Sequence, residues 1–201
     1  MSTWRDCIVV LMDLTGVKKR AFEGNASATS LMRSFHQLVH REMAAGLREL
    51  DHAYVWNDSV LLLARVDEPR AYARVMHAAD DLKRRVDTVA PSYAIAVKGR
   101  AFPGAIQGAR VTVIKASSFA MANCFEIESE AKRKELRKAW YVDVRIARRV
   151  PEARGTQWCS VKLLPSGKHR RIYTHDRYLW GANDEGRTGS TAQNLGRRSA
   201  P

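Results

Sequence analysis

An apolar run near the start of the chain, Ile8–Met12, most constrains the fold. Five apolar residues rich in β-branched side chains are too few for a helix and predict a buried strand. Asp13 then stands at the carboxyl end of this strand, before the turn Thr15-Gly16-Val17. Backbone N–H groups of such a turn can converge on an anion, and a carboxylate beside them can hold the accompanying cation. The stretch predicts a metal–nucleotide site; the alternative is that Asp13 caps its own turn.

A second acid is expected at the tip of a hairpin. Residues 52–64 contain two short apolar strands around Asn57-Asp58-Ser59, and Asn and Asp tolerate the backbone of tight turns. If this hairpin lies beside the first strand, Asp13 and Asp58 can hold two divalent cations of the kind used for attack on phosphorus. A solvated turn residue is the alternative for Asp58 alone, so the prediction depends on the pair.

Composition sets the limits of the interpretation. The 201 residues, 45% of them hydrophobic, suit one globular domain over residues 1–180, and the polar, Gly- and Ser-containing residues 181–201 predict a disordered tail. The formal net charge is +13, but Lys and Arg are scattered over predicted helices, so we expect attraction for nucleotide phosphates and no nucleic-acid partner. Three distant cysteines and the lack of a signal peptide or membrane-spanning run predict a cytoplasmic location without membrane insertion.

Hydrophobic periodicity predicts the remaining elements. Helices are expected at residues 27–50, from Pro69 onward, and at 118–138; strands are expected at 92–97, 111–114, 141–144, 158–164 and 170–173. Residues 18–25 and the Gly-containing stretch 98–108 are predicted to be loops. This order predicts an α+β sandwich in which helices pack on one largely antiparallel sheet.

Three features together resemble a known family. They are Asp13-Leu14-Thr15-Gly16 after an apolar strand, Asp58 at a hairpin tip, and the final hairpin with Val161-Lys162. Over residues 5–175 they resemble the class III nucleotidyl cyclase catalytic domain, which has a ferredoxin-like sandwich fold. The compact form without sensor modules is most similar to the pyrimidine cyclases of bacterial Pycsar anti-phage systems.

The resemblance implies roles for particular residues. Asp13 and Asp58 would hold two Mg²⁺ or Mn²⁺ ions, and the carbonyl of Leu14 would complete one coordination shell. The N–H groups of Thr15, Gly16 and Val17 would contact the β- and γ-phosphates. Lys162 matches a lysine that reaches the triphosphate from the partner chain. A homodimer with composite active sites is therefore implied.

The chain also departs from this family. Purine cyclases carry an Asn and an Arg four residues apart on the helix that corresponds to residues 118–138, where this chain has Ala120 and Cys124 with Asn123 nearby. Arg100 is the candidate to replace the missing catalytic arginine. Adenylyl cyclases place a base-reading Lys four residues before the hairpin acid, where this chain has Tyr54. The purine contact is absent, and Tyr54 is the candidate base-binding residue.

These observations predict a pyrimidine nucleotide cyclase that converts UTP to cyclic UMP and pyrophosphate, with a separate effector reading the product in anti-phage defence. The alternatives are a cytidylate cyclase, an adenylyl or guanylyl cyclase with an unusual pocket, and a basic RNA-binding module without enzymatic activity. An RNA-binding sheet is expected to expose aromatic side chains for base stacking. The strands at 8–12 and 95–97 carry no such aromatic stripe.

Overall fold

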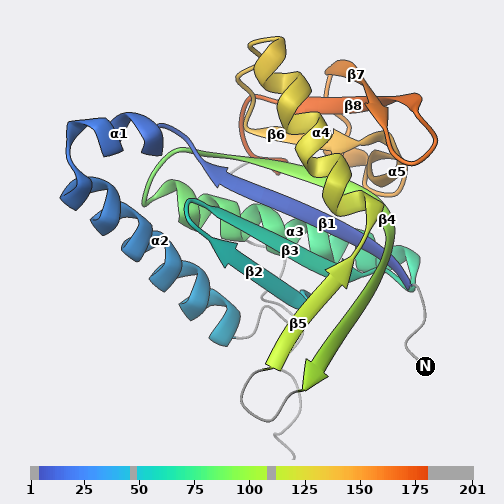
Figure 1. Ribbon diagram of the computed structural model, residues 1–201. Helices are drawn as coiled ribbons and strands as arrows, with labels where there is room; N and C mark the ends of the chain where they lie inside the picture. Colours follow the sequence, from blue (N-terminus) through green and yellow to red (C-terminus); the bar gives the residue numbers. More distant parts are fainter. Residues whose placement is uncertain (1–4, 46–48, 108–111, 181–201) are drawn as a thin grey trace, which may run out of the picture.

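A twisted, mostly antiparallel sheet organises the protein (Figure 1). The computed structural model describes residues 5–45, 49–107 and 112–180. The strands follow the order β2-β3-β1-β4-β6-β8-β7 and pair antiparallel except for the parallel pair β4–β6. Their bounds are β1 Arg5–Leu14, β2 His52–Trp56, β3 Ser59–Arg65, β4 Ser92–Gln107, β6 Trp140–Asp143, β7 Gln157–Leu163 and β8 Lys168–His175.

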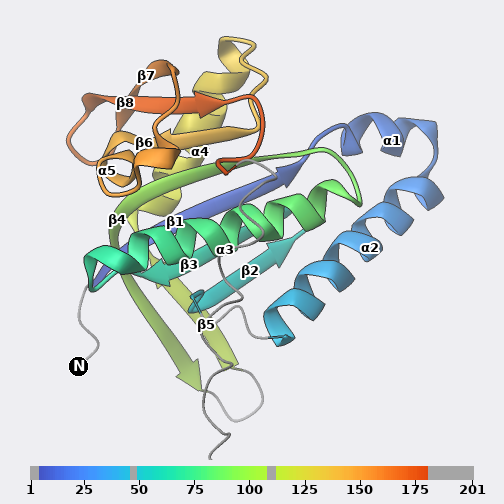
Figure 2. The same ribbon diagram turned by 180° about the vertical axis from the view of Figure 1, so that it is seen from behind.

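Helices cover both faces of the sheet (Figures 1 and 2). On one face, α2 and α3 pack on a large apolar core, and α4 packs on a second core on the opposite face. The helices are α1 Val17–Glu23, α2 Asn25–Ala44, α3 Pro69–Asp87, α4 Phe119–Arg133, the short α5 Val144–Ala147 and the 3₁₀ turn η1 Pro151–Ala153. The predicted α+β sandwich is confirmed.

The double covering explains why the first strand is almost continuously apolar. Ile8, Val10 and Met12 of β1 point into the core under α3, whereas Val9 and Leu11 point into the core under α4. All five side chains are buried. A strand with two covered faces loses the alternation of apolar and polar residues that a half-exposed strand has.

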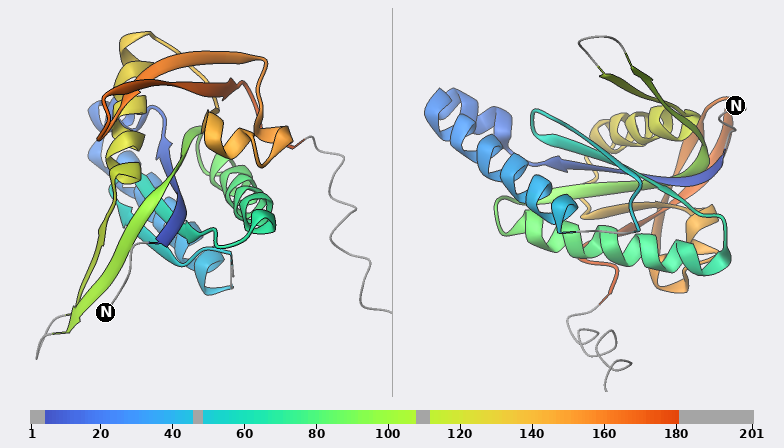
Figure 3. Two further views of the ribbon diagram at one scale, coloured as in Figure 1. Left: turned by 90° about the vertical axis from the view of Figure 1, so that its right-hand side faces the viewer. Right: turned by 90° about the horizontal axis from the view of Figure 1, so that it is seen from below.

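Two predicted loops are regular structure. Residues 17–23 form α1, because Val17 is buried in the core and the segment holds good helix formers between Gly16 and Gly24. Residues 98–107 continue β4, which pairs with β5 (Thr112–Ser117) in an arm that extends from the body (Figure 3). The strand contains Gly99 at the point where α4 approaches the sheet closely. A Cβ at this position would come within 2.5 Å of the Ala120 Cβ, so only glycine leaves room for the helix.

A helix was predicted over residues 27–50, and the corresponding helix α2 spans Asn25–Ala44 and is therefore shorter at its C-terminal end. The predicted disordered tail lies outside the described residues. Within the described ranges, no helix combines the length and the hydrophobicity needed to cross a membrane.

Candidate active site

The two predicted acids lie side by side at one end of the sheet. β1 and β3 pair so that Asp13 stands opposite Ser59, which places the hairpin tip beside the end of β1 (Figure 1). The N–H of Leu14 donates to the carbonyl of Asp58 over 2.9 Å and fixes this arrangement. Asn57 adopts a φ of 45°, the left-handed conformation that Asn tolerates and that lets the strand reverse.

The Asp13 carboxylate is held on both oxygens. Ser59 Oγ donates to one oxygen, and Tyr93 Oη lies 2.8 Å from the other. The same Tyr93 hydroxyl also hydrogen-bonds Glu128 of α4, which forms an ion pair with Lys132. Because a phenol carries one proton, Tyr93 can donate to only one of the two carboxylates at a time. Lys132, Glu128, Tyr93 and Asp13 thus form one chain from the surface of α4 to the end of β1.

The surroundings of Asp13 disfavour its ionised form. Burial raises the pKa of Asp13, the hydrogen bonds from Ser59 and Tyr93 oppose this shift, and the nearby carboxylates Asp58 and Glu128 raise the pKa further. Lys132 is already paired with Glu128, and that contact raises the pKa of Lys132. A divalent cation between Asp13 and Asp58 would relieve the repulsion directly.

The donor set fits Mg²⁺ or Mn²⁺. Carboxylate and carbonyl oxygens are the ligands these hard cations prefer, and Mg²⁺ is commonly bound by one or two carboxylates together with substrate phosphates. The residues the structure describes contain no cluster of three or more His, Cys, Asp or Glu able to hold an ion by themselves. Asp13 and Asp58 would therefore need further ligands to complete a coordination shell, and the phosphates of a nucleotide would supply them.

The balance of charges predicts a stabilising effect of Asp13→Asn in the absence of metal. Because the folded state raises the pKa of Asp13, ionised Asp13 costs stability above its unfolded pKa, and the neutral amide removes this cost. We expect the metal-free variant to melt a few degrees above wild type at neutral pH, since about 1 kcal/mol shifts Tm by roughly 2–4 °C in a domain of this size. Calorimetry in EDTA at pH 7.5 measures the difference, which should shrink toward pH 4; a variant that melts below wild type at pH 7.5 would contradict the prediction.

The turn after β1 differs in part from the prediction. Gly16 has a φ of 80°, which favours glycine, and it leads directly into α1. The N–H and the hydroxyl of Thr15, however, both donate to the carbonyl of Pro91 at 2.8 Å. Thr15 is therefore not available to a phosphate in this conformation, and the predicted backbone donors reduce to Gly16 and Val17.

The loop that anchors Thr15 is itself fixed. Asp87 accepts hydrogen bonds from the N–H and the hydroxyl of Ser92, and it forms a 2.7 Å ion pair with the buried Lys83. Lys83 also donates to the carbonyl of Ser92. The end of α3 and the start of β4 are thereby joined, so that Pro91 has a defined position beneath the turn.

Two other predicted residues lie at the opposite end of the sheet. Arg100 of β4 pairs in register with Asp6, seven residues before Asp13 on β1, so roughly 24 Å of strand separates the two positions. Arg100 and Asn123 line a pocket of about 540 Å³ beside the start of α4 and the turn after β7. Asn123 is buried and exchanges two hydrogen bonds with the backbone of Leu164. It holds the β7–β8 turn on α4.

Lys162 also lies far from Asp13 within one chain. Four strand spacings of about 4.8 Å separate β1 from β7, or roughly 19 Å across the sheet. Its neighbours Val161 and Leu163 point into the core beneath α4, so the exposed Lys162 points away from the face that carries Asp13. One chain does not bring Lys162 and the acid pair together.

Tyr54 lies on the same face of the sheet as Asp13. It pairs in register with Leu61, which is itself opposite Leu11 of β1, and it packs partly against the core beneath α4. Its hydroxyl is buried and is the one buried side-chain polar atom, among the described residues, without a hydrogen-bond partner. A buried hydroxyl without a partner is costly, and a ligand or a second chain can satisfy it.

The helix α4 does not present the two positions at which purine cyclases carry Asn and Arg. Ala120 and Cys124 are buried against the sheet, and the Cys124 sulfur lies near the carbonyls of Val9 and Ile95. The side of α4 that reaches the hairpin instead carries Phe125, whose ring lies 6.4 Å from that of Trp56.

Sequence reasoning missed four residues of this site: Ser59, Tyr93, Glu128 and Lys132. Ser59 adjoins Asp58 and could have been included from its position alone. Tyr93 is 80 residues from Asp13 and becomes its neighbour only through the β1–β4 pairing.

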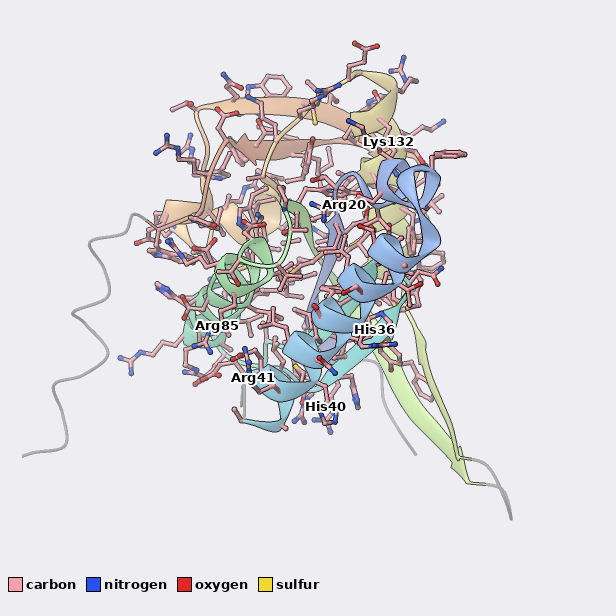
Figure 4. The ribbon with its side chains drawn as sticks, turned by 90° about the vertical axis from the view of Figure 1, so that its left-hand side faces the viewer. Arg20, His36, His40, Arg41, Arg85 and Lys132 are labelled. Atoms are coloured by element: carbon pink, nitrogen blue, oxygen red, sulfur yellow. The ribbon has the colours of Figure 1, made fainter. Side chains whose placement is uncertain are left out.

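Figure 4 shows where the neighbouring charged and titratable side chains lie. Lys132 lies at the same end of the molecule as Arg20 of α1. The exposed His36 and His40 lie along α2, and the His36 ring forms a hydrogen bond with the carbonyl of Asn57.

No protein-family model matches this sequence, and a search of curated proteins finds no relative. Solved structures do match. The adenylyl cyclase CyaB from P. aeruginosa is 10% identical with a TM-score of 0.62, and the match covers 87% of this chain and 95% of CyaB. The guanylyl cyclase Cya2 is 10% identical with a TM-score of 0.65 and coverage of 92% and 97%. The chain has a nucleotide cyclase fold.

A third cyclase neighbour was solved with a nucleotide. The catalytic core of a rhodopsin-guanylyl cyclase with converted specificity, in complex with ATPalphaS, is 15% identical. Its TM-score is 0.65, and the match covers 87% of this chain and 97% of that core. These likenesses establish the class III cyclase fold over almost all of the described chain. At this sequence identity they establish the fold alone, and the activity has to be inferred from the residues of the site.

Proposed function

We propose that this protein is a pyrimidine nucleotide cyclase that converts UTP to 3′,5′-cyclic UMP and pyrophosphate. The observation that carries the proposal is the placement of Asp13 beside Asp58 at the end of β1 in a chain with a nucleotide cyclase fold. The raised pKa of Asp13, caused first by burial, is typical of a carboxylate kept at a functional site despite its cost in stability.

In this proposal each residue has a separate task. Asp13 and Asp58 hold the cations, with the carbonyl of Leu14 as a further ligand. Two bound Mg²⁺ or Mn²⁺ ions would supply Lewis acidity at the ribose 3′-hydroxyl and charge neutralisation at the α-phosphate. Gly16 and Val17 offer backbone N–H groups to the β- and γ-phosphates.

The proposal requires a homodimer. Arg100 and Lys162 lie at the far end of the sheet from Asp13, so they can contact the same nucleotide only from a second chain. A twofold axis that sets the acid pair of one protomer against the partner's β7–β8 hairpin and the adjoining part of β4 would create two equal sites. The exposed side chains Val55, Trp56 and Phe125 next to the acid pair offer apolar surface for such a contact.

Tyr54 is proposed to read the base. Its ring would occupy the space that the second ring of a purine needs, and its hydroxyl, buried without a partner in the single chain, would hydrogen-bond the edge of uracil once the side chain rotates to expose it. A site that depends on such a bond discriminates strongly, whereas shape alone gives modest ratios.

Two substitutions separate these contributions. Tyr54→Phe removes only the hydroxyl and should lower kcat/KM for UTP by about tenfold or more, while purine triphosphates stay excluded. Tyr54→Ala also removes the ring and should relax the preference against ATP and GTP. The measurement is kcat/KM for the four triphosphates at equal metal, with the dimer checked by light scattering. Unchanged ratios in both variants would mean that another residue reads the base.

Product analysis tests the proposal as a whole. The protein is incubated with ATP, GTP, CTP or UTP and with Mn²⁺ or Mg²⁺, and the products are identified by mass. Cyclic UMP as the main product supports the proposal, and cyclic CMP would select the cytidylate alternative. A purine cyclic nucleotide as the main product would overturn the pyrimidine assignment, and no cyclic product from any triphosphate would overturn the cyclase assignment. A separate effector that reads the product, in anti-phage defence, completes the proposal.

A further inference from the structure

A second, strongly basic surface lies on the β7–β8 hairpin, away from the acid pair. A pocket of about 480 Å³ there is lined by the cationic or polar side chains Arg148, Arg154, His169, Arg170, Arg171 and Tyr173. None of the described residues that line this pocket is acidic. Arg170 is partly neutralised by the buried Asp143 at 3.4 Å, whereas Arg148, Arg154 and Arg171 form no ion pair with a described carboxylate. We call these six residues the basic groove.

Two arginines of the basic groove act on the Tyr173 hydroxyl. Interaction with Arg171 first, and with Arg154 as well, lowers the pKa of Tyr173. Guanidinium groups held close together without carboxylates repel each other, and phosphate oxygens match their planar donor geometry. The groove therefore suits a phosphate-bearing ligand.

An aromatic platform adjoins the groove. Trp158 of β7 stands opposite Tyr173 of β8 and leaves 52% of its surface exposed. The Arg171 guanidinium lies 4.4 Å from the centre of the Trp158 ring system. A large exposed aromatic side chain beside arginines is the combination with which proteins stack bases while they hold the backbone.

The positive charge extends beyond a single phosphate site. Arg170 lines both the basic groove and the larger pocket beside α4, whose lining also includes Lys98 and Arg145, paired with Asp6 and with the buried Asp143 respectively. Cationic side chains thus line both pockets, and Arg148, Arg154 and Arg171, which pair with no described carboxylate, lie in the groove. A free nucleotide would use only part of this surface, whereas a chain of phosphates can follow it.

We propose that the basic groove, together with Trp158, binds single-stranded nucleic acid, with arginines on the phosphates and the indole against a base. The strands at 8–12 and 95–97 carry no exposed aromatic side chain, whereas the hairpin carries the exposed Trp158. Arg154, Arg171 and Trp158, which the tests below change, are not among the residues assigned to the cyclase reaction.

Fluorescence anisotropy with a labelled single-stranded RNA of 20 nucleotides tests the proposal on the full chain. Arg154→Glu combined with Arg171→Glu should weaken binding at least tenfold. Losing two phosphate contacts should also reduce the slope of log Kobs against log salt by about 1.4. The matched control is Arg33→Glu with Arg70→Glu, which makes the same change in net charge at exposed positions on α2 and α3. The control should bind within about twofold of wild type.

A third variant identifies the strand type. Trp158→Ala should weaken binding to single strands several-fold and leave binding to a duplex of equal length unchanged, since paired bases are not free to stack on the indole. Equal losses in the two double variants, or no binding by wild type at physiological salt, would overturn the proposal. So would a Trp158→Ala protein that binds single strands like wild type. Thermal melts verify folding, and Arg154→Gln with Arg171→Gln replaces the Glu pair if it unfolds.

Discussion

Asp13→Asn and Asp58→Asn are each expected to abolish cyclisation while leaving the fold intact. Asp13 and Asp58 are the carboxylates of the predicted cation site at the end of β1, where burial and neighbouring negative charge disfavour an ionised Asp13 without a cation. Losing one carboxylate should lower kcat by roughly 10³-fold or more, because an ion that stabilises the transition state contributes several kcal/mol and each ~1.4 kcal/mol is tenfold.

Two measurements separate this loss from misfolding. Wild type should gain thermal stability when Mn²⁺ and a non-hydrolysable triphosphate are added together, and either variant should lose that gain, because a ligand stabilises only the state that binds it. Asp81→Asn is the matched control, since it removes an exposed carboxylate on α3, away from the site. Near-normal turnover by either folded variant at position 13 or 58 would remove the metal assignment.

Mixing two inactive variants is expected to restore activity. Asp58→Asn and Lys162→Ala should each be inactive alone. In a heterodimer, one site combines the intact acids of the Lys162→Ala chain with the intact lysine of the Asp58→Asn chain. Random exchange makes half of the dimers mixed, each with one working site of two, so about one quarter of wild-type activity should return.

The structure supplies the reason for this expectation and its control. Lys162 lies roughly 19 Å across the sheet from β1 and on the outer face of its hairpin, so it cannot complete the site of its own chain. The control mixes Asp13→Asn with Asp58→Asn. Each chain then contributes a defective acid pair to its own site, so no activity should return. Recovery in this control, or none in the test mixture after verified subunit exchange, would contradict the composite site.

The sequence determined the elements whose patterns are local. The length and β-branched content of Ile8–Met12 predicted a strand covered on both sides, and all five side chains are buried. Asn57 and Asp58 marked the hairpin because they tolerate a turn backbone that other residues avoid. From these two segments alone, the proximity of Asp13 and Asp58 could be predicted, and the strand pairing agrees with it.

Long-range packing decided what the sequence did not reveal. Residues 98–107 contain glycines and were expected to be a loop, but they continue strand β4. Gly99 leaves room there for Ala120 of α4, a residue 21 positions away in the sequence. The partners of Asp13 followed the same rule, since Tyr93 is brought in by the β1–β4 register and Glu128 by the position of α4. The Thr15 N–H was expected to be free, and the loop at Pro91 occupies it. Local propensity fixes single strands and turns, but only the tertiary structure determines which side chains distant in sequence share one carboxylate.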